Sequence, residues 1–130
     1  MKIEIWADVI CPFCGLGNHR LHTAISLFAH REHVELVHRS FQLDPSFPAG
    51  KTLPVREMLR IKYGMNDEQL RANWARIQAQ ASADGLVPFN LDNLTGNTRQ
   101  AHELLAFAGE NGLEAAAWAR LYRAYFGEGK

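Results

Sequence analysis

The hydrophobic pattern of the first third of the chain predicts a strand, a helix and a second strand. Residues 2–9 alternate between apolar and polar side chains, which is typical of a strand with one buried face. The helix is indicated by apolar residues at the spacing of one helical face: Leu21, Ala24, Ile25 and Phe28. Residues 34–43 follow as a second candidate strand. Because a helix connects them, the two strands are expected to pair in parallel, as one β-α-β unit.

Beyond residue 44 the pattern is that of helices. Residues 44–50 contain prolines and a glycine and are expected to form a turn. Three helices are then expected: one between Asn66 and Asp84-Gly85, one from Asn97 or Thr98 to Asn111-Gly112, and one over about residues 113–126. Asn66 is followed three residues later by Gln69, which is the pattern of a capping box. Residues 86–96 are expected to form a loop, and no third strand is visible.

Composition places the chain among ordinary globular proteins, with 47% hydrophobic and 22% charged residues. Lys plus Arg total 14 and so do Asp plus Glu, a balance that argues against nucleic acid or a membrane surface as the partner. The N-terminus lacks the apolar run of a secretory signal, and no later stretch is long enough to span a bilayer. A cytoplasmic location is therefore expected.

The chain has two cysteines, three positions apart, at the junction of the first strand and the helix. Pro12 suits the first turn of that helix, where its missing N–H costs nothing. Free backbone N–H groups and the positive end of the helix dipole stabilise a thiolate at such a position. Cys11 is therefore expected to attack a substrate disulfide, and Cys14 to resolve the mixed disulfide that forms.

Two other interpretations of the cysteine pair remain open. One is half of a zinc site, with His19 and His22 as further ligands. Both histidines would lie only a turn or two along the same helix, which is poor tetrahedral geometry, so we expect no metal there. The other is a pair of inert cysteines in the core.

Five stretches of the chain carry a family resemblance: residues 7–17, 41–45, 89–94, 97–102 and 121–126. They resemble the DsbA-like thioredoxin superfamily, and in particular its FrnE-type cytoplasmic branch. The cysteine motif is shared widely, whereas the Asn-Thr-x-x-Ala-His run at residues 97–102 is more specific. The resemblance covers essentially the whole chain.

The resemblance implies an α/β fold of the thioredoxin type with an inserted helical domain. Residues 1–44 would form the β-α-β part of the thioredoxin-like domain, and residues 45–130 the inserted helical domain. The family's C-terminal strands and final helix have no counterpart here, nor does the cis-proline that faces the cysteines. Pro88 is not taken as that proline, because its neighbours match the loop before the helix at residue 97.

The resemblance also implies thiol–disulfide oxidoreductase or isomerase activity on protein or small-molecule thiols, with no bound cofactor. An alternative is a glutathione-dependent isomerase or transferase of the 2-hydroxychromene-2-carboxylate isomerase or kappa type. Those relatives carry Ser near the place of Cys11, so the cysteine favours disulfide chemistry. A zinc-binding interaction domain is the non-enzymatic alternative.

Six residues are candidate substrate contacts: Pro12, Phe13, Phe89, Asn97, Thr98 and His102. Phe13 and the loop that contains Phe89 would offer apolar surface, with the helical block as a lid over the face of Cys11. Residue type alone favours helix caps for Asn97 and Thr98, and a packed core residue for His102, over substrate contacts.

A two-stranded parallel sheet is too small for a finished α/β core and leaves an unpaired edge. The chain is therefore expected either to be truncated, or to pair this edge with another copy or with a missing C-terminal half.

Overall fold

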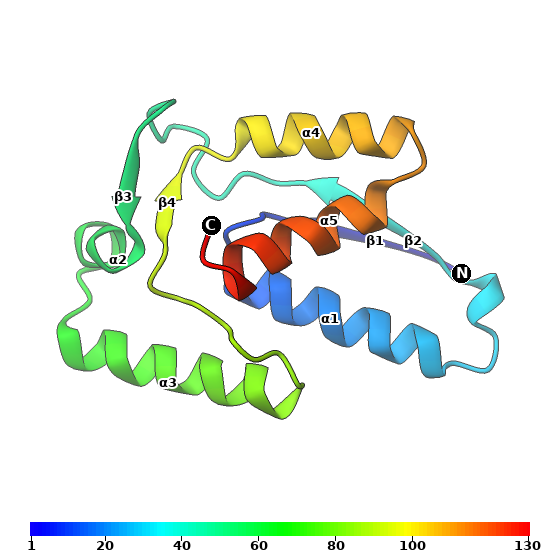
Figure 1. Cartoon of the computed structure of the whole chain (residues 1–130), viewed down its shortest axis with the longest axis horizontal. Coiled ribbons are helices and arrows are strands. Elements are labelled where there is room, and N and C mark those ends of the chain that lie inside the picture. The colour runs from blue at the N-terminus through cyan, green and yellow to red at the C-terminus, as the bar shows by residue number, and fades with distance from the viewer.

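The computed structural model describes residues 1–130. It opens with the predicted unit: β1 (Lys2–Ala7), α1 (Pro12–Leu27) and β2 (Glu35–Ser40). The strands pair in parallel, with Lys2 opposite Glu35 and Ala7 opposite Ser40. Figure 1 shows α1 running alongside this two-stranded sheet. The β-α-β prediction is confirmed.

Both strands are shorter than the pattern predicted. β1 ends at Ala7, and the carboxylate of Asp8 then accepts the backbone N–H groups of Val9 and Leu43, each at 2.8 Å. These bonds turn the backbone out of the strand ladder and toward α1. A 3₁₀ turn, Arg31–His33, separates α1 from β2.

The second part of the chain is mostly helical, as expected. Its helices are α2 (Val55–Tyr63), α3 (Asp67–Ala83), α4 (Arg99–Glu110) and α5 (Glu114–Tyr122), the last continuing into a π-helical turn, Arg123–Gly127. The capping box of α3 is confirmed, because Asn66 Oδ1 accepts the Gln69 N–H and Gln69 Oε1 accepts the Asn66 N–H. No helix of this structure is both long and apolar enough to cross a bilayer.

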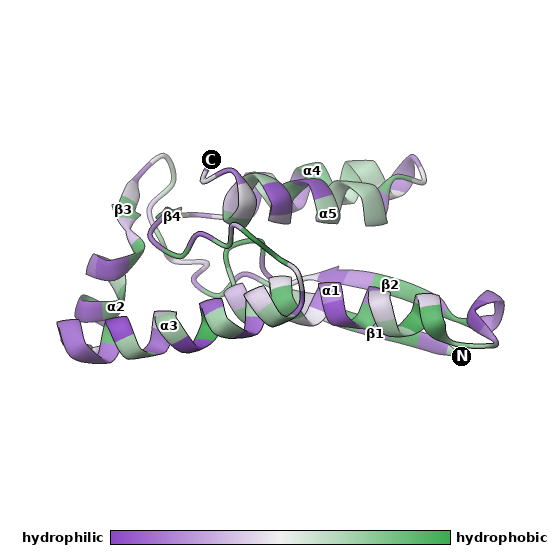
Figure 2. Ribbon diagram, turned by 60° about the horizontal axis from the view of Figure 1, so that its bottom comes forward, coloured by the Kyte–Doolittle hydropathy of each residue, from purple (hydrophilic) through white to green (hydrophobic).

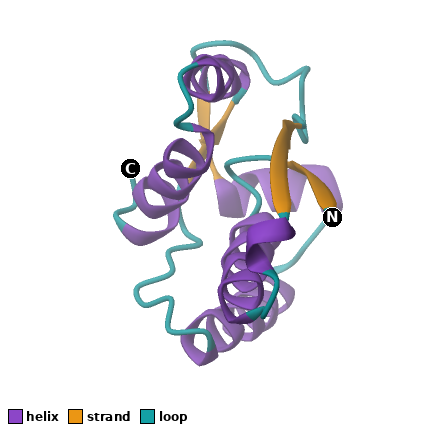
Figure 3. Cartoon of the chain, turned by 90° about the vertical axis from the view of Figure 1, so that its right-hand side faces the viewer, coloured by secondary structure: helices purple, strands orange, loops and turns teal.

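A second strand pair was not predicted. β3 (Thr52–Pro54) and β4 (Leu94–Gly96) pair antiparallel, so residues expected to be turn or loop form a short ladder. Strands of three residues are too short to show an alternating pattern, and their partners are far apart in the sequence. Figure 3 shows the two strand pairs standing apart in a mainly helical chain.

One hydrophobic core joins the β-α-β unit to the later helices. Its buried residues come from both of the segments predicted as 1–44 and 45–130: Ala7, Val9, Leu16, Ile77, Ala81, Phe89, Leu91, Leu105, Trp118, Tyr122 and Phe126. α5 packs alongside α4, and its last residue, Tyr122, lies against Gly15 of α1, while α2 and α3 extend away from the sheet (Figure 1). The outer end of the α2–α3 unit is mainly hydrophilic (Figure 2). The core therefore meets the start of α1, where the cysteines lie.

Candidate active site

Cys11 is the N-cap of α1, as the position of Pro12 predicted. Its backbone is extended, at φ −85° and ψ 114°, and its Sγ accepts the N–H of Cys14 at 3.3 Å. The Cys11 N–H donates to the backbone carbonyl of Asp8, also at 3.3 Å. Both cysteines are partly buried free thiols. The sulfur of Cys11 therefore stands where the helix offers an unpaired N–H group.

Each thiol affects how the other titrates, through a hydrogen bond from one thiol to the sulfur of the other when that sulfur ionises. With Cys11 as donor, the bond lowers the pKa of Cys14 to about 7, while burial opposes that change. The same bond, with burial, raises the pKa of Cys11 above the ordinary thiol range, although the backbone N–H groups of Cys14 and Phe13 act to lower it. When the Cys14 thiol donates instead, Cys11 becomes the thiolate that the hydrogen bond stabilises. The reduced pair therefore loses one proton readily and retains the other.

The two sulfurs differ in what they face. Cys11, Pro12 and Phe13 line an apolar pocket of about 270 Å³, whose opposite wall is formed by α2 and α3. The residues of that wall include Val55, Met58, Leu59, Tyr63, Trp74 and Ile77. No Lys, Arg, Asp or Glu lines this pocket. Cys14 is absent from its lining and packs against the hydrophobic core instead.

Behind the cysteines, the carboxylate of Asp8 collects four hydrogen-bond donors. Besides the N–H groups of Val9 and Leu43, Oδ2 faces the Thr98 hydroxyl at 3.3 Å and Oδ1 faces Nε2 of His102 at 3.0 Å. The side chain of Asp8 is 0% exposed and that of His102 is 7% exposed. Three segments that are distant in the sequence, at residues 8–9, 43 and 98–102, therefore come together around this buried carboxylate.

Two of the predicted substrate contacts lie beside Cys11. Pro12 and Phe13 both line the apolar pocket, and the ring of Phe13 is 52% exposed. Phe89 lies elsewhere: it is buried and stacks on Phe126, with 4.7 Å between ring centroids. It belongs to the core and to the wall of a second cavity, so contact between Phe89 and a substrate stays a prediction.

The specific run at residues 97–102 does not reach the pocket wall, and only its Thr98 and His102 are buried. Thr98 is the N-cap residue of α4 and makes no side-chain capping bond. Just before it, Asn97 Oδ1 accepts the Arg99 N–H at 2.9 Å and Asn97 Nδ2 donates to the Phe47 carbonyl at 2.6 Å. Thr98 and His102 are buried against Asp8. None of the three lines the pocket that contains Cys11, so their roles as substrate contacts also stay predictions.

The histidines considered as zinc ligands are engaged elsewhere. His19 Nε2 lies 3.0 Å from the Asp84 carbonyl, and the ring of His22 stacks on that of His38. No group of three or more His, Cys, Asp or Glu side chains is placed to hold a metal ion.

A second, larger cavity of about 560 Å³ runs along α1, away from Cys11. Gly15, Asn18, Val87-Pro88 and Tyr122 are among the residues that line it. The Val87–Pro88 peptide bond is cis, and Pro88 stands in this cavity rather than in the pocket beside Cys11.

The sequence analysis expected helices over Cys11, but it did not identify the residues of the wall that α2 and α3 place there. The hydrophobic pattern that would predict an apolar face on α2 is weak, because Met58 and Leu59 belong to a helix whose other residues are largely charged. Trp74 packs against the core and also lines the pocket.

Comparisons with known proteins agree with this geometry. A family model described as a DSBA-like thioredoxin domain matches residues 2–130. A crystal structure of a probable DsbA oxidoreductase from Streptomyces coelicolor superposes with a TM-score of 0.93 at 41% identity. The match covers 100% of this chain and 56% of that one, so the chain spans little more than half the length of this relative. Curated protein sequences give no match. The chain belongs to the family of DSBA-like thioredoxin domains.

Proposed function

We propose that this protein is a thiol–disulfide oxidoreductase in which Cys11 attacks and Cys14 resolves. One observation carries the proposal: Cys11 caps α1 and faces an open apolar pocket, while Cys14 lies behind it against the core. The family membership and the relative named as a probable DsbA oxidoreductase support the same activity.

The reaction uses only the two thiols and a substrate disulfide. The Cys11 thiolate attacks one substrate sulfur, forming a mixed disulfide and releasing the other sulfur as a thiolate that takes up a proton. Cys14 then loses its proton and attacks Cys11 Sγ, which releases the second substrate thiol and leaves a Cys11–Cys14 disulfide. The substrate is reduced by two electrons and the protein is oxidised by two, and the reverse sequence oxidises a substrate dithiol.

The pocket favours substrates with an apolar group next to the reacting sulfur. Helices α2 and α3 form the wall opposite Cys11, which fits the expected lid. Glutathione carries two carboxylates, and no cationic side chain lines the pocket to pair with them. A protein or peptide disulfide is therefore the better fit, and neither glutathione-dependent isomerisation nor zinc binding gains support here.

The FrnE-type assignment is a further proposal, which rests on the motif at residues 97–102. A cytoplasmic location likewise stays a proposal.

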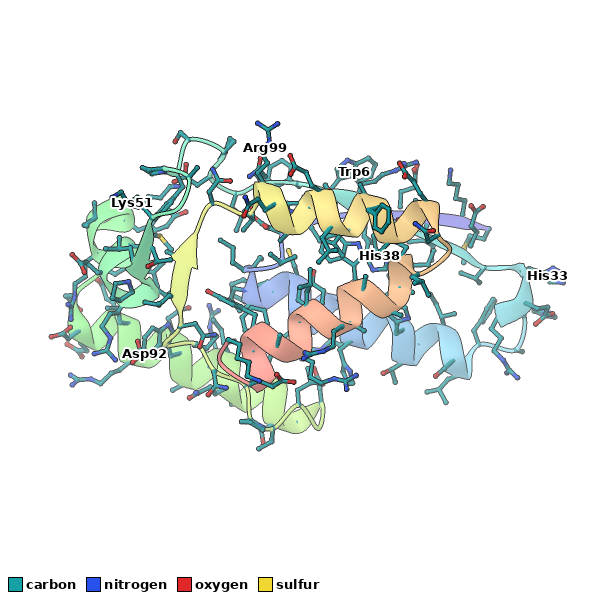
Figure 4. The ribbon with its side chains drawn as sticks, turned by 45° about the horizontal axis from the view of Figure 1, so that its top comes forward. Trp6, His33, His38, Lys51, Asp92 and Arg99 are labelled. Atoms are coloured by element: carbon teal, nitrogen blue, oxygen red, sulfur yellow. The ribbon has the colours of Figure 1, made fainter.

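The sheet also supports the expected pairing of its edge. β1 bonds to β2 on one side only, and Trp6 on β1 is 61% exposed (Figure 4). We propose that a further strand, from a second copy or from a C-terminal half, pairs with this edge.

The activity is tested by reduction of insulin with dithiothreitol, followed as turbidity, for the wild type, Cys11→Ser and Cys14→Ser. Loss of turnover in both variants is expected, with Cys14→Ser alone accumulating a mixed disulfide with the substrate. Full turnover by Cys11→Ser would exclude the proposed chemistry. Sedimentation of the chain tests whether a second copy pairs with this edge.

A further inference from the structure

The larger cavity, along α1, takes no part in the disulfide chemistry proposed above. Its volume of about 560 Å³ is typical of small-molecule sites, which usually measure about 300–1,000 Å³. Three segments line it: one face of α1, residues 85–89, and α5 with the π-helical turn that follows. Phe126 is the only residue that it shares with the pocket beside Cys11, so the two spaces are separate.

Small residues leave this space open. α1 contributes Gly15 to the lining, and α5 contributes Ala115 and Ala119, both of which are exposed. Much of the remaining wall is apolar: Leu86, Val87, Pro88, Phe89 and Phe126. Val87 is 72% exposed, so part of this apolar wall faces water. The apolar body of a ligand would cover it and release that water.

Asn18 is a buried polar side chain on the same wall, and its amide nitrogen has no partner. The side chain is 9% exposed, and its Oδ1 accepts a hydrogen bond from Nε2 of His38 at 2.8 Å. Its Nδ2 makes no hydrogen bond to the protein, whereas polar groups buried to this extent normally have one. The N–H groups of this amide are therefore free to donate to an oxygen atom of a ligand in the cavity.

Arg123 brings a positive charge to the cavity, and no carboxylate of the protein pairs with it. It lies on the π-helical turn and its side chain is exposed. Glu128 is the one acidic residue in the lining, and it is already paired with Arg120 and Lys130, each at 3.2 Å. The lining therefore combines an apolar wall with an unpaired cation and a free amide.

We propose that this cavity is a second binding site, which takes a carboxylic acid with an apolar body. The carboxylate would accept hydrogen bonds from Arg123 and from the amide of Asn18, and the body would lie against Val87 and fill the space beside Ala119. Charge-assisted hydrogen bonds of this kind are about twice as strong as neutral ones. The inference does not depend on the proposed disulfide chemistry, because neither cysteine lines the cavity.

The probe is octanoate, titrated into the full chain and followed by NMR through the backbone amide signals. We expect saturable shifts at Gly85 and Gly127, which line the cavity, and none at Phe13 or Met58, which line the pocket beside Cys11. Octanol has the same apolar chain without the charge. It should bind about tenfold more weakly, because it cannot form the charge-assisted bonds.

Two exposed positions allow the site to be changed without disturbing the core. Ala119→Trp fills the cavity and should abolish the shifts. Ala116→Trp is the matched control, since Ala116 is exposed on the same helix and does not line the cavity. Arg123→Gln should weaken the binding of octanoate about tenfold and leave that of octanol unchanged, and Arg123→Lys should restore most of the loss.

The inference is overturned if octanoate shows no saturable binding, if its shifts lie at the pocket beside Cys11, or if Ala119→Trp binds it as the wild type does. It is also overturned if Arg123→Gln affects octanoate and octanol equally. Cys11→Ser should bind octanoate with unchanged affinity. Because insulin reduction is scored separately, failure of the proposed function would leave this result intact.

Discussion

Gly15, next to Cys14 in the first turn of α1, lies so close to the ring of Phe126 that a Cβ on the glycine would stand 3.3 Å from two ring carbons. Phe126 is 3% exposed and stacks on Phe89, so the ring has little room to withdraw. The close approach lets the C-terminal π-helical turn pack directly against the helix that carries the dithiol. The absence of a side chain at residue 15 is therefore a packing requirement.

We predict that Gly15→Ala lowers the free energy of unfolding by about 1–3 kcal/mol, because the new methyl group overpacks the contact with Phe126. Gly17→Ala is the matched control on the same helix. Gly17 is exposed and nothing lies within 4 Å of a Cβ there, so alanine should stabilise the helix by ~0.5–1 kcal/mol. Urea denaturation of both variants measures the difference. Equal stabilisation by both replacements would show that Phe126 moves aside freely.

The cysteines provide a second prediction, on which the assignment of their roles depends. The reduced pair forms one thiolate with a pKa of about 7, so the rate of alkylation should rise steeply between about pH 6 and 8. An ordinary thiol would instead show this rise near about pH 8.5. Because Cys11 faces the pocket and Cys14 the core, Cys11 should be the residue modified first. Peptide mass spectrometry after brief exposure to iodoacetamide identifies the modified residue. Faster modification of Cys14 would reverse the proposed roles.

The sequence predicts those features whose residues are neighbours in the chain, and it does not predict contacts between residues that are far apart in the chain. The α1 cap and the α3 capping box are local, because the residues that make them lie within one turn, and both were found correctly. The contact between Asp8 and His102 joins residues 94 positions apart and leaves no periodic pattern, so nothing in the sequence predicted it. Phe89 illustrates the same limit: its residue type suggested apolar surface, whereas only the fold shows that Phe126 already covers it.

The pocket wall on α2 provides a third prediction. Met58→Asp places a charge in the apolar pocket opposite Cys11, so turnover of a peptide disulfide should fall about tenfold, because burying an unpaired carboxylate disfavours substrate binding. Turnover of a very small disulfide reagent, which needs no contact with the wall, should change little. Ile61→Asp is the control on the same helix, since Ile61 is 72% exposed and does not line the pocket. A similar loss for both substrates in Met58→Asp would remove the wall from substrate binding.

The last prediction concerns His38, whose buried ring packs between Asn18 and Trp118 while His33 extends into solvent (Figure 4). Burial lowers the pKa of His38, and the Glu114 carboxylate offsets this only in part. In the unfolded chain the imidazole titrates near its ordinary value of about 6.5. Below that pH the unfolded state binds a proton that the folded state does not, so the free energy of unfolding falls as the pH falls.

The stability that neutral His38 contributes is therefore complete above about pH 6.5 and is lost as the pH drops toward the lowered pKa of the folded state. His38→Gln keeps an amide donor for Asn18 but cannot take up a proton. Its free energy of unfolding, measured in urea at pH 7 and pH 5, should fall less than that of the wild type over the same interval. His33→Gln replaces a histidine whose side chain is 75% exposed, and it should follow the wild type. Parallel pH profiles for His38→Gln and the wild type would show that burial of this imidazole does not contribute to the acid sensitivity of the fold.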